Sequence, residues 1–388
     1  MTQTTVAAIL TPLGRGGIAV LGVAGPQAHQ QAREVFRPKR PLPRTLDGSR
    51  LHYGHIVQDD EVLDEVLVRF LSPSERADGQ PAVEVNCHGG VVAVQRVLAC
   101  FTRRGARAVE SEDFLARAAR SRIEAEAAQA LLAAPTELGA EILLDQLAGA
   151  LEGALERLPT DRPQALAAAL RELLATERFG RALWQPPVVT LVGPTNAGKS
   201  TLFNALAREE RMIVSPQPGT TRDTVGAEVA IGGVPVWLAD TAGQREPASE
   251  LEAAAIGRAR GAAAAADLAL LVLDGSVPLP VPLEALRQAV AAPGLAVVNK
   301  SDLALASWSR DATDAVVVSA VTGRGLDELA RRISAALVGE ARQPGRPVVF
   351  TERQADALRA ALGAAEAGDL QEARRHLGKA RGGEPQTA

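Results

Sequence analysis

The sequence GPTNAGKS occupies residues 193–200, between an apolar, β-branched run at 188–192 and a helix-like segment at 201–206. Strand, glycine-bounded loop, Lys-Ser and helix are the parts of a phosphate-binding loop in their required order. Backbone N–H groups and the helix N-terminus form a concave anion site there. We expect Lys199 to reach the β- and γ-phosphates of a nucleotide and the Ser200 hydroxyl to ligate Mg²⁺. The residues of this loop predicted to bind nucleotide are Asn196, Ala197, Gly198, Lys199, Ser200 and Thr201.

A first partner motif, GTTRD, lies at residues 219–223, about one helix downstream. Thr220 or Thr221 can complete a Mg²⁺ coordination shell only while a γ-phosphate is present. The segment is therefore a candidate switch that substrate orders and hydrolysis releases. On its own the motif would indicate an ordinary loop.

A second partner motif, DTAG, lies at residues 240–243 and ends the predicted strand 234–239. Asp240 is placed to hold Mg²⁺ through water, and the Gly243 N–H to contact the γ-phosphate. Thr241 and Ala242 complete the predicted contact segment. Alone, these residues would indicate only a turn at a strand end.

A third motif, NKSD, lies at residues 299–302 after the predicted strand 295–298. The Asp302 carboxylate can accept both N–H groups of a guanine edge, a pair that adenine cannot offer, so the motif selects GTP. Asn299 and Lys300 belong to the same set, and Ser319 and Ala320 are expected to support the base from the other side. Motifs in this order, each at a strand end, predict GTP binding and disfavour an ATP-dependent motor.

The composition bounds the rest. A chain of 388 residues suggests two or three domains. Its net charge of −4 gives no global case for nucleic-acid binding, although it leaves room for a local basic patch. Two cysteines are too few for a disulfide framework, no signal peptide is evident, and no apolar run is long enough to span a bilayer. We therefore expect a cytoplasmic protein that makes no membrane contact.

Residues 1–115 are predicted to form an α+β domain, with strands at 6–10, 18–23, 62–70 and 82–86 and a helix at 91–102. Residues 36–44 hold three prolines and four basic residues. They fit either a nucleic-acid patch or a solvated loop, and the loop is favoured. The segment CHGG at 87–90 suggests a metal ligand or nucleophile. Because no second Cys/His pair lies at ligand spacing, a structural turn is favoured.

The remaining chain is predicted to form two further domains. Residues 116–185 are helical in pattern, residues 186–338 alternate strand and helix, and residues 339–388 are helical again and short. Within these helical parts, residues 111–134, 138–158 and 164–179 are expected as continuous helical stretches. The fold class is thus an α/β P-loop GTPase domain with a mostly parallel sheet, inserted in an α-helical domain and preceded by an α+β domain.

At this point the chain resembles the TRAFAC-class GTPases and, among them, the MnmE (TrmE) family of tRNA modification GTPases. The resemblance covers nearly the whole chain and includes TPLGRGGI at 11–18, VEVNCHGG at 83–90 and the GTPase domain inserted between helical segments. It implies potassium-stimulated hydrolysis of GTP to GDP, coupled to homodimerisation. It also implies a role in tRNA wobble-uridine modification together with a FAD-dependent partner.

The resemblance also assigns roles to single residues. It places the Mg²⁺ threonine at Thr221 beside Ser200, and the potassium ligands at Asn196, Ser215, Gln217 and Thr220. Potassium would supply positive charge at the transition state in place of an arginine finger. Glu252 would orient the attacking water and act with Lys199 and Gly243 in catalysis. Without the resemblance Glu252 would be a solvated helix carboxylate, and Glu250 is a close competitor.

Some positions depart from the family pattern. The family's C-terminal Cys-Ile-Gly-Lys is absent, and the sequence given ends in GEPQTA at 383–388. Positions tied to 5-formyl-tetrahydrofolate appear as Gly22, as GQP at 79–81 and as AARSR at 118–122. Because a folate carboxylate needs cationic partners, weak or no folate binding is expected. Two hypotheses stand: a GTPase in tRNA modification, or a regulatory GTP-dependent dimerisation switch that has lost that chemistry.

Overall fold

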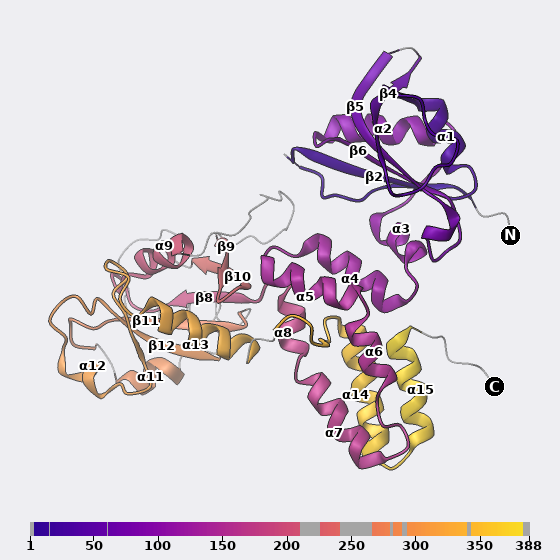
Figure 1. The fold of residues 1–388 in the computed structure, drawn as a ribbon. Helices are drawn as coiled ribbons and strands as arrows, with labels where there is room; N and C mark the ends of the chain where they lie inside the picture. The colour runs from indigo at the N-terminus through magenta and orange to yellow at the C-terminus, as the bar shows by residue number, and fades with distance from the viewer. Residues whose placement is uncertain are drawn as a thin grey trace.

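The computed structural model describes residues 4–14, 16–59, 61–209, 226–240, 266–279, 282–288, 293–339 and 343–382. Figure 1 shows three parts: an N-terminal sheet with helices, a central group of helices, and a second sheet flanked by helices. This arrangement confirms the predicted fold class. None of the described helices combines the length and apolar character needed to cross a bilayer.

The N-terminal part is a seven-stranded sheet in the order β3-β4-β5-β6-β2-β1-β7. Helices α1 and α2 cover one face, where Phe70 and Phe101 are fully buried, and Phe114 of α3 covers part of the other face. The elements are β1 Val6–Ile9, β2 Ile18–Ala24, α1 Ala28–Val35, β3 Phe36–Pro38, β4 Leu51–Gln58, β5 Glu61–Leu71, the 3₁₀ turn η1 Pro73–Glu75, β6 Ala82–His88, α2 Val91–Thr102, β7 Arg107–Ala108 and α3 Ser111–Ala118.

Three sequence predictions in this domain need correction. Helix α1 and strand β4 were not predicted, although α1 buries Ala28, Ala32 and Val35 at helical spacing. Residues 36–38 form an edge strand rather than a loop, because Phe36 pairs with Ile56 of β4. Strand β6 continues to His88, so the turn before α2 consists of the two glycines at 89–90.

The central helices are shorter than the periodicity predicted. Ser121 caps the start of α4 through its side chain, Gly149 adopts φ 98° before α6, and Thr176 turns its hydroxyl back to the Leu173 carbonyl between α7 and α8. Each of these local features marks a boundary between two helices that apolar spacing alone would join. The helices are α4 Arg122–Ala133, α5 Glu137–Leu147, α6 Ala150–Glu156, α7 Pro163–Leu174, α8 Glu177–Ala182, α14 Glu352–Glu366 and α15 Leu370–Arg381.

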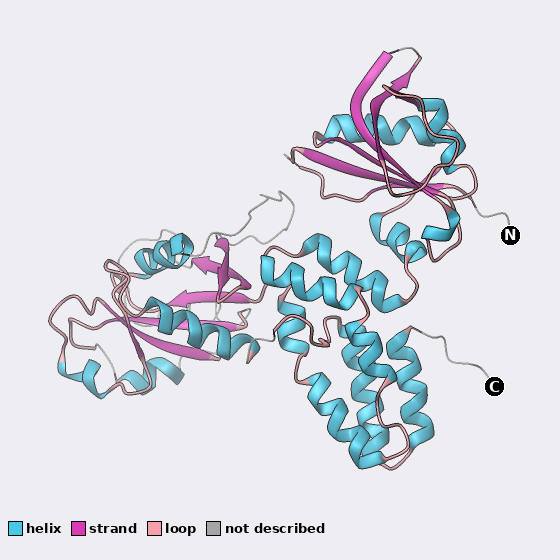
Figure 2. Ribbon diagram, viewed as in Figure 1, coloured by secondary structure: helices cyan, strands magenta, loops and turns pink. Residues whose placement is uncertain are grey.

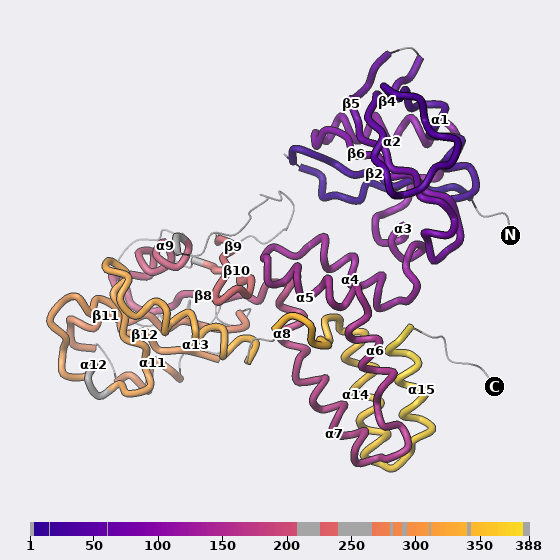
Figure 3. Tube along the Cα trace, in the orientation of Figure 1, coloured from indigo at the N-terminus to yellow at the C-terminus, as the bar shows by residue number. Residues whose placement is uncertain are grey.

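Polar contacts join the helices that precede the second sheet to those that follow it. Buried Gln146 donates to the Arg346 carbonyl at 2.9 Å and accepts from the Val348 N–H at 3.1 Å. Glu126 accepts from Arg353 Nη2 and Gln354 Nε2, both at 2.8 Å. Figures 2 and 3 show α14 and α15 beside α6 and α7. The two halves thus form one helical domain, and the second sheet is an insertion in it.

The inserted domain is a six-stranded sheet in the order β13-β12-β11-β8-β10-β9. All its neighbouring strands run parallel except β9, which forms a hairpin with β10. Parallel central strands read as continuous apolar runs, as β11 does, because both faces are covered. The elements are β8 Val188–Val192, α9 Lys199–Glu209, β9 Gly226–Ile231, β10 Val234–Asp240, β11 Leu268–Asp274, α11 Leu283–Gln288, β12 Gly294–Asn299, α12 Ser307–Asp311, β13 Val316–Val317 and α13 Leu326–Val338.

Candidate nucleotide-binding site

The predicted motifs follow strands whose carboxyl ends share one edge of the second sheet. In the parallel registers, Asp240 of β10 lies opposite Leu191 of β8, and Asn299 of β12 lies opposite Asp274 of β11. The loop after β8 therefore emerges beside the ends of β10, β11 and β12. In open α/β sheets this edge is where ligands bind.

The loop at residues 193–198 needs its glycines. Gly193 has φ 140°, and a Cβ there would lie 2.1 Å from the Val272 carbonyl oxygen. Gly198 has φ 88°, and Asn196 is also left-handed at φ 63°. Lys199 Nζ donates to the carbonyls of Gly193 at 3.0 Å and Pro194 at 2.8 Å. The ammonium group is thus held over the loop, where it can meet an anionic ligand.

Asn299 connects this loop to two other segments. Its side chain is buried; Nδ2 donates to the Ala197 carbonyl at 3.0 Å, and Oδ1 accepts from the Ala320 N–H at 3.1 Å. A Cβ on Gly198 would lie 2.3 Å from Asn299 Nδ2. A single buried amide therefore fixes the phosphate-binding loop against the segment that contains Asp302 and the one that contains Ser319.

Two further contacts orient the NKSD residues. Ser319 Oγ donates to Asp302 Oδ1 at 2.6 Å, and Lys300 Nζ donates to Asp274 Oδ2 at 2.6 Å. Burial opposes ionisation of Asp274, but hydrogen bonds from Lys300 and Ser276 hold the pKa of its carboxyl below the ordinary value. The Lys300 ammonium is thus held at the end of β11, and one Asp302 oxygen is engaged by a neutral hydroxyl.

The structure brings part of the predicted set together. The described residues of that set are Asn196, Ala197, Gly198, Lys199, Ser200, Thr201, Asn299, Lys300, Asp302, Ser319 and Ala320. Asp240 is placed by its backbone at the end of β10. The other predicted residues lie outside the described residues: Ser215, Gln217, Thr220, Thr221, Thr241, Ala242, Gly243, Glu250 and Glu252.

The sequence interpretation left two residues out of the site. Asp274 pairs with Lys300, and a carboxylate at the end of the apolar run 268–273 was a usable signal. Gly193 opens the loop, and its contact with β11 could not be foreseen because it depends on how closely β8 and β11 approach. Both lie where β11 meets the site: Gly193 packs against this strand, and Asp274 at its end holds Lys300.

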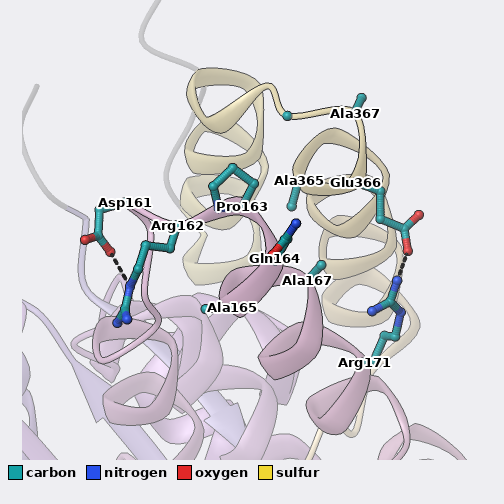
Figure 4. Close-up of a pocket in the computed structure, with 11 residues that line it drawn as sticks. Asp161, Arg162, Pro163, Gln164, Ala165, Ala167, Arg171, Ala365, Glu366 and Ala367 are labelled. Carbon is teal, nitrogen blue, oxygen red and sulfur yellow. Dashed lines mark hydrogen bonds and ion pairs between the residues drawn. The ribbon is translucent and has the colours of Figure 1, made fainter.

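A separate pocket lies in the helical domain, between the start of α7 and the turn joining α14 to α15 (Figure 4). Its volume is about 810 Å³, and none of the predicted site residues lines it. Arg171 and Glu366 form an ion pair of 2.5 Å on its wall, and Arg162 lies near Asp161 at 3.7 Å. Because the charged residues of this pocket pair with one another, we do not assign the predicted nucleotide-binding function to it.

Two family models match the chain. Residues 5–121 match the model described as GTP-binding protein TrmE N-terminus, and residues 188–311 match 50S ribosome-binding GTPase. A tRNA modification GTPase MnmE of Moorella thermoacetica is 36% identical, over 92% of this chain and 87% of that protein. The MnmE of Chloroflexus aurantiacus is 38% identical, over 86% of this chain and 82% of that protein. The chain belongs to the tRNA modification GTPase MnmE family.

Membership in the MnmE family confirms the resemblance drawn from the sequence motifs. Its two matched segments correspond to the N-terminal sheet and to the sheet that carries the loop at residues 193–198. Among solved structures, the G domain of the T. maritima FeoB iron transporter is 25% identical, with a TM-score of 0.29, over 39% of this chain and 99% of that chain.

Proposed function

We propose that this MnmE-family chain hydrolyses GTP to GDP and that this hydrolysis is linked to modification of the wobble uridine of tRNA. The observation that supports GTP is the contact of Asn299 with both the loop and Ala320, together with the hydrogen bond between Asp302 and Ser319. These contacts set a carboxylate beside the phosphate-binding loop. A carboxylate that the base covers on binding and that only guanine can satisfy rejects adenine strongly.

The residues of the loop fit a magnesium-bound triphosphate. Backbone N–H groups and Lys199 bind the phosphate oxygens, and the Ser200 hydroxyl at the start of α9 is a hard oxygen donor of the kind Mg²⁺ prefers. When bound, the ion neutralises phosphate charge. We assign Thr221 to the same ion, Thr220, Thr241 and Ala242 to nucleotide contacts, the Asp240 carboxylate to water-mediated support, and the Gly243 N–H and Glu252 to the γ-phosphate and the attacking water.

We further propose that potassium stimulates hydrolysis. Asn196 is exposed and has a left-handed backbone within the loop, which supports a role for its side chain as a ligand. Ser215, Gln217 and Thr220 would complete the ligand set. Replacing potassium chloride by sodium chloride at equal ionic strength should lower GTP turnover about tenfold or more. Equal rates in the two salts would refute this assignment.

The proposed setting is a homodimer that acts with a FAD-dependent partner on tRNA. Both cysteines, Cys87 and Cys100, are free and buried, which fits the reducing cytoplasm. Loss of the modified wobble uridine from cells that lack this protein would support the link to tRNA. An unchanged tRNA nucleoside profile would contradict it.

A second candidate function is a GTP-dependent switch without folate chemistry. A Cβ on Gly22 would lie 2.5 Å from Cζ of Phe114, so that ring fills the space where a cationic side chain would stand. Arg76, 5.7 Å from the same ring centroid, is already paired with Asp78 at 2.7 Å, and Arg120 is paired with Glu124. We therefore expect weak or no 5-formyl-tetrahydrofolate binding. Tight binding by calorimetry would overturn this alternative.

Nucleotide preference tests the main proposal directly. With Mg²⁺ and K⁺ present, the purified full chain should turn over GTP and leave ATP almost untouched. The Lys199→Ala variant should lose turnover of GTP. If GTP and ATP bound and reacted equally, the proposed function would be wrong.

A further inference from the structure

The edge of the N-terminal sheet carries a run of exposed cations without carboxylate partners. Residues 36–46 contain Arg37, Lys39, Arg40 and Arg44 and no acidic residue. Arg37 donates to the carbonyl of Glu34 at 3.1 Å, and the described structure gives none of the four an ion pair. Some other arginines of the same domain are paired with carboxylates, as Arg69 with Glu84 and Arg96 with Glu61. We call residues 37–46 the basic strap.

The basic strap is held in place from within. Leu42 and Leu46 pack against the core under α1 and α2, and the Lys39 N–H donates to the Tyr53 carbonyl at 2.9 Å. Prolines at 38, 41 and 43 restrict the backbone between these anchors. Its cations therefore project from a segment with a restricted backbone that bends at residues 39–40 and 44–45, and little conformational entropy remains to be lost on binding an anionic polymer.

An aromatic residue stands next to these cations. In the antiparallel register Arg37 pairs with His55, and Lys39 follows opposite Tyr53. Gly54 and Ile56 are buried under the helices, so Tyr53 and His55 lie on the opposite, open face of the sheet. Tyr53, the single tyrosine of the chain, is 45% exposed, and its ring centroid lies 6.4 Å from that of His55.

We propose that the basic strap and β4 bind single-stranded RNA. Cations in a row neutralise successive phosphates, and an exposed tyrosine stacks on a base that is free of a duplex. Glu65 on β5 and Glu84 on β6 face the same side of the sheet as Tyr53. Their carboxylates repel phosphates, so the bound RNA follows the basic strap and does not cross the sheet.

Figure 1 shows the turn of the β4–β5 hairpin at the end of the N-terminal domain that is farthest from the helical domain. The choice of RNA as the polymer rests on the link to tRNA proposed above, whereas the need for phosphates and an unstacked base follows from the strap itself.

Fluorescence anisotropy with a labelled 12-nucleotide oligouridylate and the full chain tests this surface. The triple variant Lys39→Gln/Arg40→Gln/Arg44→Gln should bind about tenfold or more weakly at 100 mM KCl. Its log–log salt slope should be smaller by about 2, since each phosphate contact on a single strand contributes about 0.7. Tyr53→Ala should weaken binding about tenfold, and Tyr53→Phe should bind like the wild type because it keeps the ring.

A matched control removes equal charge elsewhere in the same domain. Arg103, Arg107 and Arg117 are exposed and have no ion pair in the described structure. The triple variant Arg103→Gln/Arg107→Gln/Arg117→Gln should bind within twofold of the wild type. If the strap and control variants lost the same amount of RNA affinity, the effect would come from net charge alone, and the proposal would be overturned. Unchanged binding by the strap variant, or dissociation of a dimer by Tyr53→Ala with RNA affinity unchanged, would also overturn it.

Two readouts separate this inference from the proposed GTPase activity. The strap variant should keep the wild-type melting temperature, because its three side chains are exposed, and the wild-type rate of GTP turnover. Intact GTP turnover with unchanged RNA binding would refute the RNA surface alone. Lack of GTP preference with a strap-dependent RNA affinity would refute the hydrolysis proposal alone.

Discussion

The motif residues of the two sheet domains differ in how far along the chain their polar partners lie. In the inserted domain, Asn299 reaches a carbonyl 102 positions away in sequence, and Lys300 and Asp302 each find a partner at a neighbouring strand end. In the N-terminal domain, Gly22 lies under the ring of Phe114 and Arg120 is neutralised by Glu124 four residues on. The first arrangement keeps an edge of the sheet ready for a ligand, whereas the second uses the corresponding positions for packing and local pairing.

The contrast suggests which domain carries specific small-molecule recognition. A site that binds a ligand needs polar groups from distant segments held in register, because local pairs are already satisfied without a ligand. By this criterion we propose that the inserted domain has a ligand site and that the folate positions of the N-terminal domain do not form one. The predictions below test each side of the comparison.

The largest effect is expected at the base-recognition carboxylate. Asp302→Asn replaces one of the two carboxylate acceptors by an NH₂ donor, so one of the two N–H groups of guanine loses its acceptor and faces another donor. GTP affinity should fall by roughly 1,000-fold or more, and xanthosine triphosphate, which offers a carbonyl in place of the amino group, should bind better than GTP. Competition with a fluorescent guanine nucleotide measures both affinities. Unchanged GTP affinity would break the assignment of the inserted domain as a guanine site.

The next effect concerns the chemical step. Glu252→Ala should lower GTP turnover at least about 100-fold, because the water loses its orienting carboxylate, while GTP affinity stays nearly constant. Glu250→Ala is the matched control and should retain most turnover. The reverse pattern, with Glu250 essential and Glu252 dispensable, would show that the wrong carboxylate was chosen.

The sequence predicted more of the inserted domain than of the N-terminal domain. The loop at 193–198 and the NKSD motif are short and local, so their positions at strand ends followed from pattern alone. The Asn299–Ala197 contact and the pairing of Lys300 with Asp274 required the three-dimensional order of β8, β11 and β12. Strand β4 escaped prediction because Gly54 and two histidines interrupt its apolar alternation, and its place is set by pairing with β5.

The helical domain shows the same limit. Apolar spacing predicted helices within residues 111–179 but not their ends, since spacing carries no information on Gly149 at φ 98° or on the Thr176 hydroxyl. The folate positions could be found in the sequence, but the reason Gly22 is a glycine could not. It depends on Phe114, a residue of α3 that packs over β2.

A smaller effect is expected at Gly22 of the N-terminal domain, where the ring of Phe114 fills the space beside the backbone. Gly22→Arg forces a side chain into the ring of Phe114 and should lower the free energy of unfolding by about 1–3 kcal/mol, as overpacking does. Gly17→Arg is the control, because no atom lies within 4 Å of a Cβ at that position. Urea denaturation measures both. In a Phe114→Ala background Gly22→Arg should cost less; an equal cost in both backgrounds would show that Phe114 does not close this position.

The smallest effect concerns a polar pair on the open side of the same domain. His88 Nδ1 lies 2.5 Å from Asp64 Oδ1, and the Asp64 carboxylate also accepts from the His88 N–H at 2.8 Å. The hydrogen bond and charge of Asp64 raise the pKa of the His88 imidazole above its ordinary value. A raised pKa in the folded state stabilises the fold below the unfolded-state pKa near 6.5, and this stabilisation is lost as the pH rises through the folded-state value.

This linkage gives a measurable sign. The melting temperature of the wild type should exceed that of His88→Gln more at pH 5.5 than at pH 8.5, and NMR titration should place the His88 pKa above the ordinary value. Asp64→Asn removes the charge but keeps the shape, so it should return the His88 pKa toward that value. If the His88 pKa were the same in the Asp64→Asn variant as in the wild type, the pair would be a geometric neighbour only.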